Sequence, residues 1–247
     1  MTLTEKNIRE KEFHNIAAVK KKPRFEGIFY KAVFNARKHF FDYLNINARG
    51  KEILDFGCGI GGMSRKVYEL GPKRIVGIDI SDEAIKLAIS KAEELNLKIE
   101  YKIENCEKLN LPLESFDIVY GFGILHHLNL LESINEITKV LKKKGSIIFV
   151  EPLGTNPIIN LYRVLTPKSR SQDEHPFMFK DLDLIKNHFK FTKINYYGFL
   201  TIIFFLFYKN PEKSIIYNFL SQVDNFIFKI KYLRFLAWSV MITAEKN

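Results

Sequence analysis

A carboxylate and a run of glycines stand together in residues 53–62, Ile-Leu-Asp-Phe-Gly-Cys-Gly-Ile-Gly-Gly. A short apolar stretch ends at Asp55, and glycines follow at 57, 59 and 61. Glycine adopts backbone angles that are closed to other residues, and it lets a ligand approach the main chain. The amides at the start of the following helix then face whatever lies over the turn. This stretch therefore predicts a ligand-binding loop between a strand and a helix.

Two ligand classes fit such a loop. Gly57, Gly59 and Gly62 match the G-x-G-x-x-G pattern of dinucleotide-binding proteins, and Asp79 lies 22 residues after Gly57. That pattern is weakly specific when it stands alone. Asp55 suits the cationic end of a ligand, whereas it would repel a pyrophosphate.

Four segments resemble class I methyltransferases that use S-adenosylmethionine, of the methyltransferase type 11-like kind. Residues 55–61 resemble the D/E-x-G-x-G-x-G signature, and residues 105–107 (Asn-Cys-Glu) look like the adenine-contacting turn. Residues 111–128 resemble the LPF…FD-V…LHHL block, and residues 141–145 the L-K-P-G-G turn. The resemblance covers residues 50–152, which is about 40% of the chain.

The resemblance implies S-adenosyl-L-methionine as the cofactor, with its amino acid end over Asp55 and the glycines. Asp79 would accept both ribose hydroxyls. The family usually has Asp at the adenine turn, but the carbonyl oxygen of Asn105 can still accept from an amino group. No metal site is predicted. The implied cofactor-binding residues are Asp55, Gly57, Cys58, Gly59, Gly61, Asp79, Ile80, Asn105, Cys106, Glu107 and Gly121.

The elements that must position these residues alternate along the chain. Apolar periodicity predicts strands at 52–56, 74–80, 98–103, 116–122, 145–150, 191–197 and 237–244. It predicts helices at 27–44, 62–70, 82–95, 130–142, 181–188 and 214–232, and Phe13 and His14 suggest a short helix over the site. Such alternation indicates an α/β fold with a doubly wound, seven-stranded, mostly parallel sheet, Rossmann-like and with helical caps from both ends of the chain. The candidate residues follow strand ends and should share one rim.

We divide the chain into three parts on this basis. Residues 1–45 form an N-terminal helical cap, and residues 46–152 form the core that binds S-adenosylmethionine. Residues 153–247 complete the sheet and carry acceptor-cap insertions at 153–180 and 198–235, of which the first shows no clean period.

Composition restricts the cellular setting. Two cysteines in 247 residues give no disulfide framework, and the N-terminus lacks a signal-peptide core, so we expect a cytoplasmic protein. The net charge of +10 divides into +6 in residues 1–38, −2 in 39–161 and +6 in 162–247. Basic flanks suit nucleic acid, an anionic membrane or an anionic substrate, although a lysine-rich solvated surface explains them equally well. Residues 198–235 hold 8 of the 22 phenylalanines and could be a lid, a peripheral membrane face or a dimer interface.

The resemblance implies methyl transfer by in-line attack on a sulfonium. A general base assists when the acceptor is a hydroxyl. We rank His175 first, because it lies in the irregular insert where acceptor loops belong, and then His126, Glu151 and His14; His127 is as doubtful as His126. The main hypothesis is O-methylation of a small, partly apolar or lipid-linked molecule. The alternatives are methylation of RNA or protein, N-methylation of a small amine, and an NAD-dependent or non-catalytic protein. Nucleic acid is not favoured, because no RNA-binding module is visible.

Overall fold

The computed structural model describes residues 3–20, 31–166 and 171–247. The strands are β1 (Glu52–Phe56), β2 (Arg74–Asp79), β3 (Glu100–Ile103), β4 (Phe116–Phe122), β5 (Leu141–Pro152), β6 (Lys190–Tyr197) and β7 (Ser239–Glu245). The α-helices are α1 (Glu5–Val19), α3 (Phe34–Asn47), α4 (Gly62–Tyr68), α5 (Asp82–Glu94), α6 (Leu130–Val140), α7 (Pro157–Leu165), α8 (Phe179–His188), α9 (Leu200–Ile203) and α10 (Ile215–Ile227). Short 3₁₀ turns are η1 (Leu125–His127), η3 (Phe205–Phe207), η4 (Pro211–Lys213) and η5 (Lys231–Leu236).

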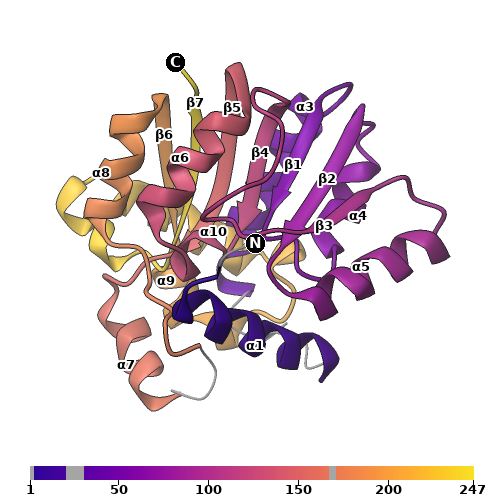
Figure 1. Cartoon of the computed structure of the whole chain (residues 1–247). Coiled ribbons are helices and arrows are strands. Elements are labelled where there is room, and N and C mark those ends of the chain that lie inside the picture. The colour runs from indigo at the N-terminus through magenta and orange to yellow at the C-terminus, as the bar shows by residue number, and fades with distance from the viewer. Residues whose placement is uncertain (1–2, 21–30, 167–170) are drawn as a thin grey trace.

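The strands form one seven-stranded sheet in the order β3-β2-β1-β4-β5-β7-β6 (Figure 1). β1 to β5 pair in parallel, and β7 runs antiparallel to both β5 and β6. The predicted fold class is therefore confirmed. Because β6 has the same direction as β5, its carboxyl end lies on the same rim as the glycine loop. The insert that follows β6 must start at that rim.

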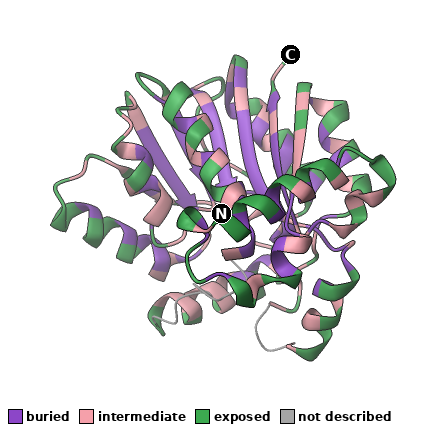
Figure 2. Cartoon of the chain, turned by 180° about the vertical axis from the view of Figure 1, so that it is seen from behind, coloured by how far each residue is buried: buried purple, intermediate pink, exposed green. Residues whose placement is uncertain are grey.

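Two cores, one on each face of the sheet, fix the strand positions. Ile53, Ile75 and Ile118 belong to one core, against α3 and α4. Their neighbours Leu54 and Val76 belong to the other core, against α6 and α8. Successive strand residues point to opposite faces, so both faces need apolar side chains and the central strands read as continuous apolar runs. Figure 2 shows the buried residues concentrated in these strands.

Three helix predictions need correction. Residues 153–180 are not irregular throughout, because α7 begins at Pro157 with Asn156 accepting from Ile158 N at 2.9 Å. An N-cap Asn followed by proline is a helix-start signal that periodicity alone does not reveal. The helix expected at 214–232 ends at Ile227, and a 3₁₀ turn follows. The helix expected at 27–44 corresponds to α3, Phe34–Asn47, and residues 27–30 lie outside the described ranges.

In the described part of the chain, none of the helices has the length and apolar character that a membrane crossing requires. The apolar insert 198–235 is divided among α9, η3, η4, α10 and η5.

Candidate cofactor and active site

The glycine loop after β1 exposes its main chain to a cavity at the carboxyl ends of the strands. Gly57 and Gly59 line that cavity with φ of +78° and +52°. A Cβ on Gly57 would lie 2.4 Å from Ile124 Cγ1, whereas a Cβ on Gly59 would meet nothing within 4 Å. Left-handed backbone favours glycine at both positions. The absence of side chains thus leaves the loop backbone open to a ligand.

Asp79, at the end of β2, holds this loop in place. Its Oδ2 accepts from Gly59 N at 2.8 Å, and its Oδ1 accepts from Ser81 N at 2.9 Å. The side chain is 8% exposed and lines the cavity. A carboxylate has about four lone-pair sites, so two remain for hydroxyl groups of a ligand. Asp79 therefore lies where a ribose diol could be bound.

Asn105 forms the opposite end of the cavity with residues of α1. Its Oδ1 accepts from Glu107 N at 2.9 Å, and its Nδ2 donates to Asn7 Oδ1 at 3.2 Å. Asn7 Nδ2 in turn donates to Glu107 Oε2 at 2.8 Å. The carbonyl oxygen of Asn105, which was expected to accept from adenine, is therefore already engaged within its own turn. Its second lone pair is the one left for a ligand.

Helix α1 lies below the strands at the edge of the sheet, as Figure 1 shows, and contributes to the cavity lining. Asn7, Glu10 and His14 recur at helical spacing on its inner face, and all three line the cavity. Burial raises the pKa of Glu10, but contacts with His127, His14 and Ser171 outweigh it and hold that pKa below the ordinary value. The expected short helix near His14 is thus a fifteen-residue helix that supplies one wall of the site.

Asp55 is buried beneath the loop. It is 2% exposed, and its Oδ2 accepts from Ser64 Oγ at 2.5 Å. Burial raises its pKa to about 6, although the hydrogen bond from Ser64 acts in the opposite direction. Asp55 is not among the described residues that line the cavity. Any effect that it has on a cofactor would have to act through the loop or through water.

His126 and Glu151 form a buried pair behind the cavity wall. His126 Nδ1 lies 2.7 Å from Glu151 Oε2, while Glu151 Oε1 accepts from Ile124 N at 3.0 Å and Leu125 N at 2.9 Å. Burial raises the pKa of Glu151 to about 7 against these hydrogen bonds. The His126 ring packs 4.2 Å from the ring of His127, which lines the cavity. Glu151 therefore orients the imidazole of His126, and the His126 ring in turn packs against the imidazole of His127.

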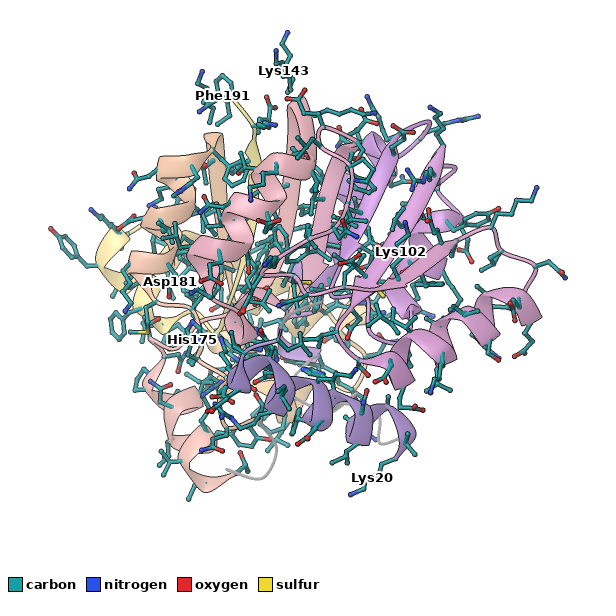
Figure 3. The ribbon with its side chains drawn as sticks, viewed as in Figure 1. Lys20, Lys102, Lys143, His175, Asp181 and Phe191 are labelled. Atoms are coloured by element: carbon teal, nitrogen blue, oxygen red, sulfur yellow. The ribbon has the colours of Figure 1, made fainter. Side chains whose placement is uncertain are left out.

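His175 lies outside the cavity lining, although the sequence placed it first as the base. Its side chain is exposed, and its backbone N–H donates to His126 O at 3.0 Å, which is the hydrogen bond that the described residues show between His175 and this region. Figure 3 shows His175 on the side of the molecule where α1 lies, whereas Phe191 stands at the opposite end of the sheet. A base role for His175 would require its loop to turn inward.

The cavity brings together about half of the residues that the sequence singled out. Of the expected cofactor residues, the lining includes Gly57, Gly59, Asp79, Ile80, Asn105 and Cys106. Those that stand behind the described lining are Asp55, Cys58, Gly61, Glu107 and Gly121. Burial raises the pKa of both cysteine thiols well above the ordinary value. Sequence reasoning missed Asn7 and Glu10, although their spacing with His14 places all three on one helical face.

Comparison with known proteins shows that the part of the chain that forms this cavity is similar to methyltransferases. Residues 54–149 match the model of a family described as "Methyltransferase domain". The chain is 38% identical over 104 residues to the ubiquinone biosynthesis O-methyltransferase of Pelagibacter ubique, covering 42% of each chain. It is 28% identical over 155 residues to phosphoethanolamine N-methyltransferase 3 of Arabidopsis thaliana, covering 61% of this chain and 31% of the relative. This chain therefore spans less than half the length of either relative.

Among solved structures, the chain resembles geranyl diphosphate C-methyltransferase from Streptomyces coelicolor, in complex with Mg²⁺, geranyl diphosphate and S-adenosyl-L-homocysteine. The TM-score is 0.68 over all of both chains, at 13% sequence identity. At that identity, the structural likeness shows the fold alone. The similar proteins transfer methyl groups to oxygen, nitrogen or carbon according to their names.

Proposed function

We propose, from the membership of this chain in the class I S-adenosylmethionine-dependent methyltransferase family, that it transfers a methyl group from that cofactor to a small, partly apolar acceptor. The observation that carries the proposal is the cavity at the carboxyl ends of β1 to β4. It joins open glycine backbone, the Asp79 carboxylate and the Asn105 amide in one space. Class I cofactor sites in open α/β sheets lie at this rim.

The residues present fit the proposed cofactor. S-adenosylmethionine supplies, when bound, a methyl group on a sulfonium that an acceptor can attack in line. Gly59 offers its main chain without a side chain in the way, and Asp79 offers two lone pairs to the ribose hydroxyls. Asn105 and Cys106 line the end of the cavity that would hold the adenine.

The chain's own contribution to the reaction is mainly to orient the acceptor and exclude water. Phe122, Ile124 and Leu128 give the cavity an apolar wall next to His127. We propose His126 rather than His175 as the general base, because Glu151 fixes the orientation of the His126 ring. Since His126 stands behind the described cavity lining, it would act on the acceptor through one bound water. A base is useful for a hydroxyl and dispensable for a free amine. The buried pair therefore favours transfer to oxygen.

Calorimetry with S-adenosyl-L-homocysteine and with NAD tests the cofactor. Binding of the first and not the second is expected, and no heat with the first would sink the proposal. Turnover with methyl-labelled cofactor should then be compared for phenolic and amine acceptors of matched size. Faster transfer to amines would overturn O-methylation in favour of N-methylation. Salt-dependent binding of bulk RNA would revive the nucleic acid alternative.

We also propose that the insert after β6 touches an anionic membrane surface. Helix α10 turns its apolar stripe outward: Ile215 is 86% exposed, and Phe219 and Phe226 are 64% and 66% exposed. The inner face carries Tyr217, Leu220, Ser221 and Asp224, all of them buried. Asp224 accepts from Phe199 N at 3.0 Å and Leu200 N at 2.8 Å, and so fastens α10 to the start of α9. The apolar stripe is therefore available for an external contact.

The surroundings of this stripe favour lipid as that contact. η3, in the same insert, adds Leu206 and Phe207, which are 77% and 66% exposed. The other insert, 153–180, also carries exposed apolar side chains on α7, Leu161 and Val164, at 61% and 75%. The neighbouring exposed lysines are Lys209, Lys213, Lys229 and Lys231. Apolar side chains flanked by lysines bind interfaces of anionic bilayers. All these segments follow strands that end at the cavity rim, so a lipid-linked acceptor would approach the site directly.

Sedimentation with vesicles tests the membrane contact. The chain should bind vesicles that contain phosphatidylserine, release as salt rises, and ignore purely zwitterionic vesicles at physiological salt. A Phe219→Ser/Phe226→Ser variant should lose most of that binding. Phe191→Ser is the matched control, because Phe191 is 80% exposed at the far end of the sheet. Equal loss in the control, or no binding by the parent chain, would contradict the proposal.

A further inference from the structure

Two potential metal ligands lie one helical turn apart on α1. Glu10 and His14 stand at i and i+4, so their side chains emerge from the same face of the helix. That face is turned into the cavity, where His127 of η1 meets it. One carboxylate oxygen and one nitrogen from each histidine lie within 4.8 Å of one another. The fold thus assembles a His₂-carboxylate group from segments far apart in the sequence.

The two oxygens of Glu10 have different surroundings. Oε1 accepts from Ser171 Oγ at 2.5 Å, which orients the carboxylate. Oε2 lies 3.3 Å from His14 Nε2 and 3.2 Å from His127 Nδ1. Yet Oε2 has no hydrogen bond of acceptable geometry to any described residue, although it is buried. A buried carboxylate oxygen that is close to two nitrogens but aligned with neither is costly unless another group satisfies it.

The separations match those between ligands of a single ion. Ligand atoms about 2.1 Å from a common metal are about 3.0 Å apart at a right angle and about 3.4 Å apart at the tetrahedral angle. The two measured separations from Glu10 Oε2 fall between these values. We propose that Glu10, His14 and His127 bind one divalent transition-metal ion in the cavity.

A second group of three ligands, His126, His127 and Glu174, is less suited to a metal. Glu174 is engaged by Arg163, whose Nη2 lies 3.0 Å from its Oε1. His126 is engaged by Glu151. Both ligands would have to give up an existing partner. The group on α1 requires no such exchange for Oε2 of Glu10, so we assign the ion to it.

The ligand set indicates which ions would bind. Imidazole nitrogens suit Zn²⁺, Fe²⁺, Co²⁺ and Ni²⁺, and two histidines with one carboxylate leave coordination positions open. Mg²⁺ prefers all-oxygen ligands and should bind poorly here. The open positions would face the cavity. If the proposed methyl transfer to oxygen is correct, they are where an acceptor hydroxyl would bind and lose its proton more readily.

Metal titration of the full chain, without cofactor or acceptor, tests the site. Calorimetry with ZnCl₂ should give one ion per chain with a dissociation constant of about 1 µM or lower. CoCl₂ should produce a visible absorption band that ZnCl₂ displaces, and MgCl₂ should compete with neither. Glu10→Gln and His14→Gln should each weaken Zn²⁺ binding by about 100-fold or more. His188→Gln, on α8, should leave the affinity within about twofold, since the hydrogen bond described for His188 stays within its own helix, from the ring to Leu184 O.

Three results would overturn the assignment. One is no binding at about 100 µM metal. Another is unchanged affinity in both Glu10→Gln and His14→Gln, with circular dichroism showing both folded. The third is loss of binding in Glu174→Gln but not in Glu10→Gln, which would move the ion to the other group. Because no cofactor is present, failure here leaves the proposed methyl transfer intact. Conversely, the chain could bind Zn²⁺ as proposed even if calorimetry showed no binding of the cofactor, so the two proposals can fail separately.

Discussion

Asn15 on α1 and Asp82 at the start of α5 are joined by a side-chain hydrogen bond, with Asn15 Nδ2 donating to Asp82 Oδ1 at 2.7 Å. Asn15 Oδ1 also accepts from Ser81 Oγ at 2.6 Å. At the other end of α1, Asn7 bonds to Asn105 and Glu107. The helix that closes the cavity is thus fastened by an asparagine at each end, and opening it must break these hydrogen bonds.

Asn15→Ala should therefore make the lid open more often. Asn15 makes three such hydrogen bonds, because its Oδ1 also accepts from Glu83 N at 3.3 Å. Partly buried hydrogen bonds contribute about 0.5–1.5 kcal/mol each, so their loss should speed cofactor release by about tenfold or more. Stopped-flow displacement of a fluorescent cofactor analogue measures the rate. Asn47→Ala is the control, because the side chain of Asn47 is exposed at the end of α3 and, among the residues that the structure describes, hydrogen-bonds to Tyr43 O of the same helix. An unchanged release rate would show that α1 does not gate the cavity.

Asp79→Asn should weaken binding of S-adenosyl-L-homocysteine by about 10- to 100-fold, the usual effect of losing hydrogen bonds to a charged group. The new amide would also point a donor at Gly59 N or Ser81 N, which both already donate to this side chain. Calorimetry gives the affinity, and thermal unfolding shows whether the fold persists. Asp183→Asn, on α8, should bind normally. Full affinity in Asp79→Asn would remove the ribose role.

Gly57→Ala compared with Gly50→Ala separates crowding from backbone strain. Both glycines have similar φ, +78° and +71°, but only Gly57 has Ile124 in the path of a new Cβ. Both variants should lose about 1 kcal/mol of unfolding free energy, because alanine is strained in a left-handed backbone conformation. Gly57→Ala should lose a further 1–3 kcal/mol, roughly, because the site is overpacked. Urea unfolding measures both free energies. Equal losses would mean that Ile124 moves aside freely.

Asp55 should make stability depend on pH in a defined direction. Its pKa in the folded chain, about 6, is above the ordinary 3.8, so the folded state favours the protonated form. The contribution of Asp55 to the free energy of unfolding is fully present below pH 3.8 and is lost as the pH rises through 6. The parent chain should therefore lose up to about 3 kcal/mol relative to Asp55→Asn between pH 4 and pH 7. Urea unfolding at each pH gives the difference, and parallel curves would refute it.

His126→Gln should reduce turnover by about 100-fold or more while cofactor affinity stays within about twofold, because a general base acts on the acceptor. Glu151→Gln should act in the same direction by releasing the orientation of the imidazole. Labelled-methyl turnover and calorimetry measure the two quantities. His175→Gln distinguishes the candidates: a large loss there, with His126→Gln unaffected, would restore the order that the sequence favoured.

Local sequence determined the scaffold of this site. The strand that carries Asp55, the glycines after it and the N-cap at Ser81 are all specified within a few neighbouring residues. Periodicity and turn chemistry are local, so these elements could be predicted with small boundary errors. The side chains at the carboxyl ends of the parallel strands then had to meet on one rim, and Asp79 and Asn105 do so.

Tertiary structure alone decided what closes that rim. His127 follows His14 by 113 residues, and no local pattern states that α1 folds back to bring Glu10 and His14 beside it. The apolar residues of α10 were visible in the sequence, but only packing showed that Ile215, Phe219 and Phe226 face outward, while Tyr217, Leu220 and Asp224 are buried on the inner face. Long-range contacts of this kind depend on which surfaces remain after the sheet has formed, and periodicity carries no information about them.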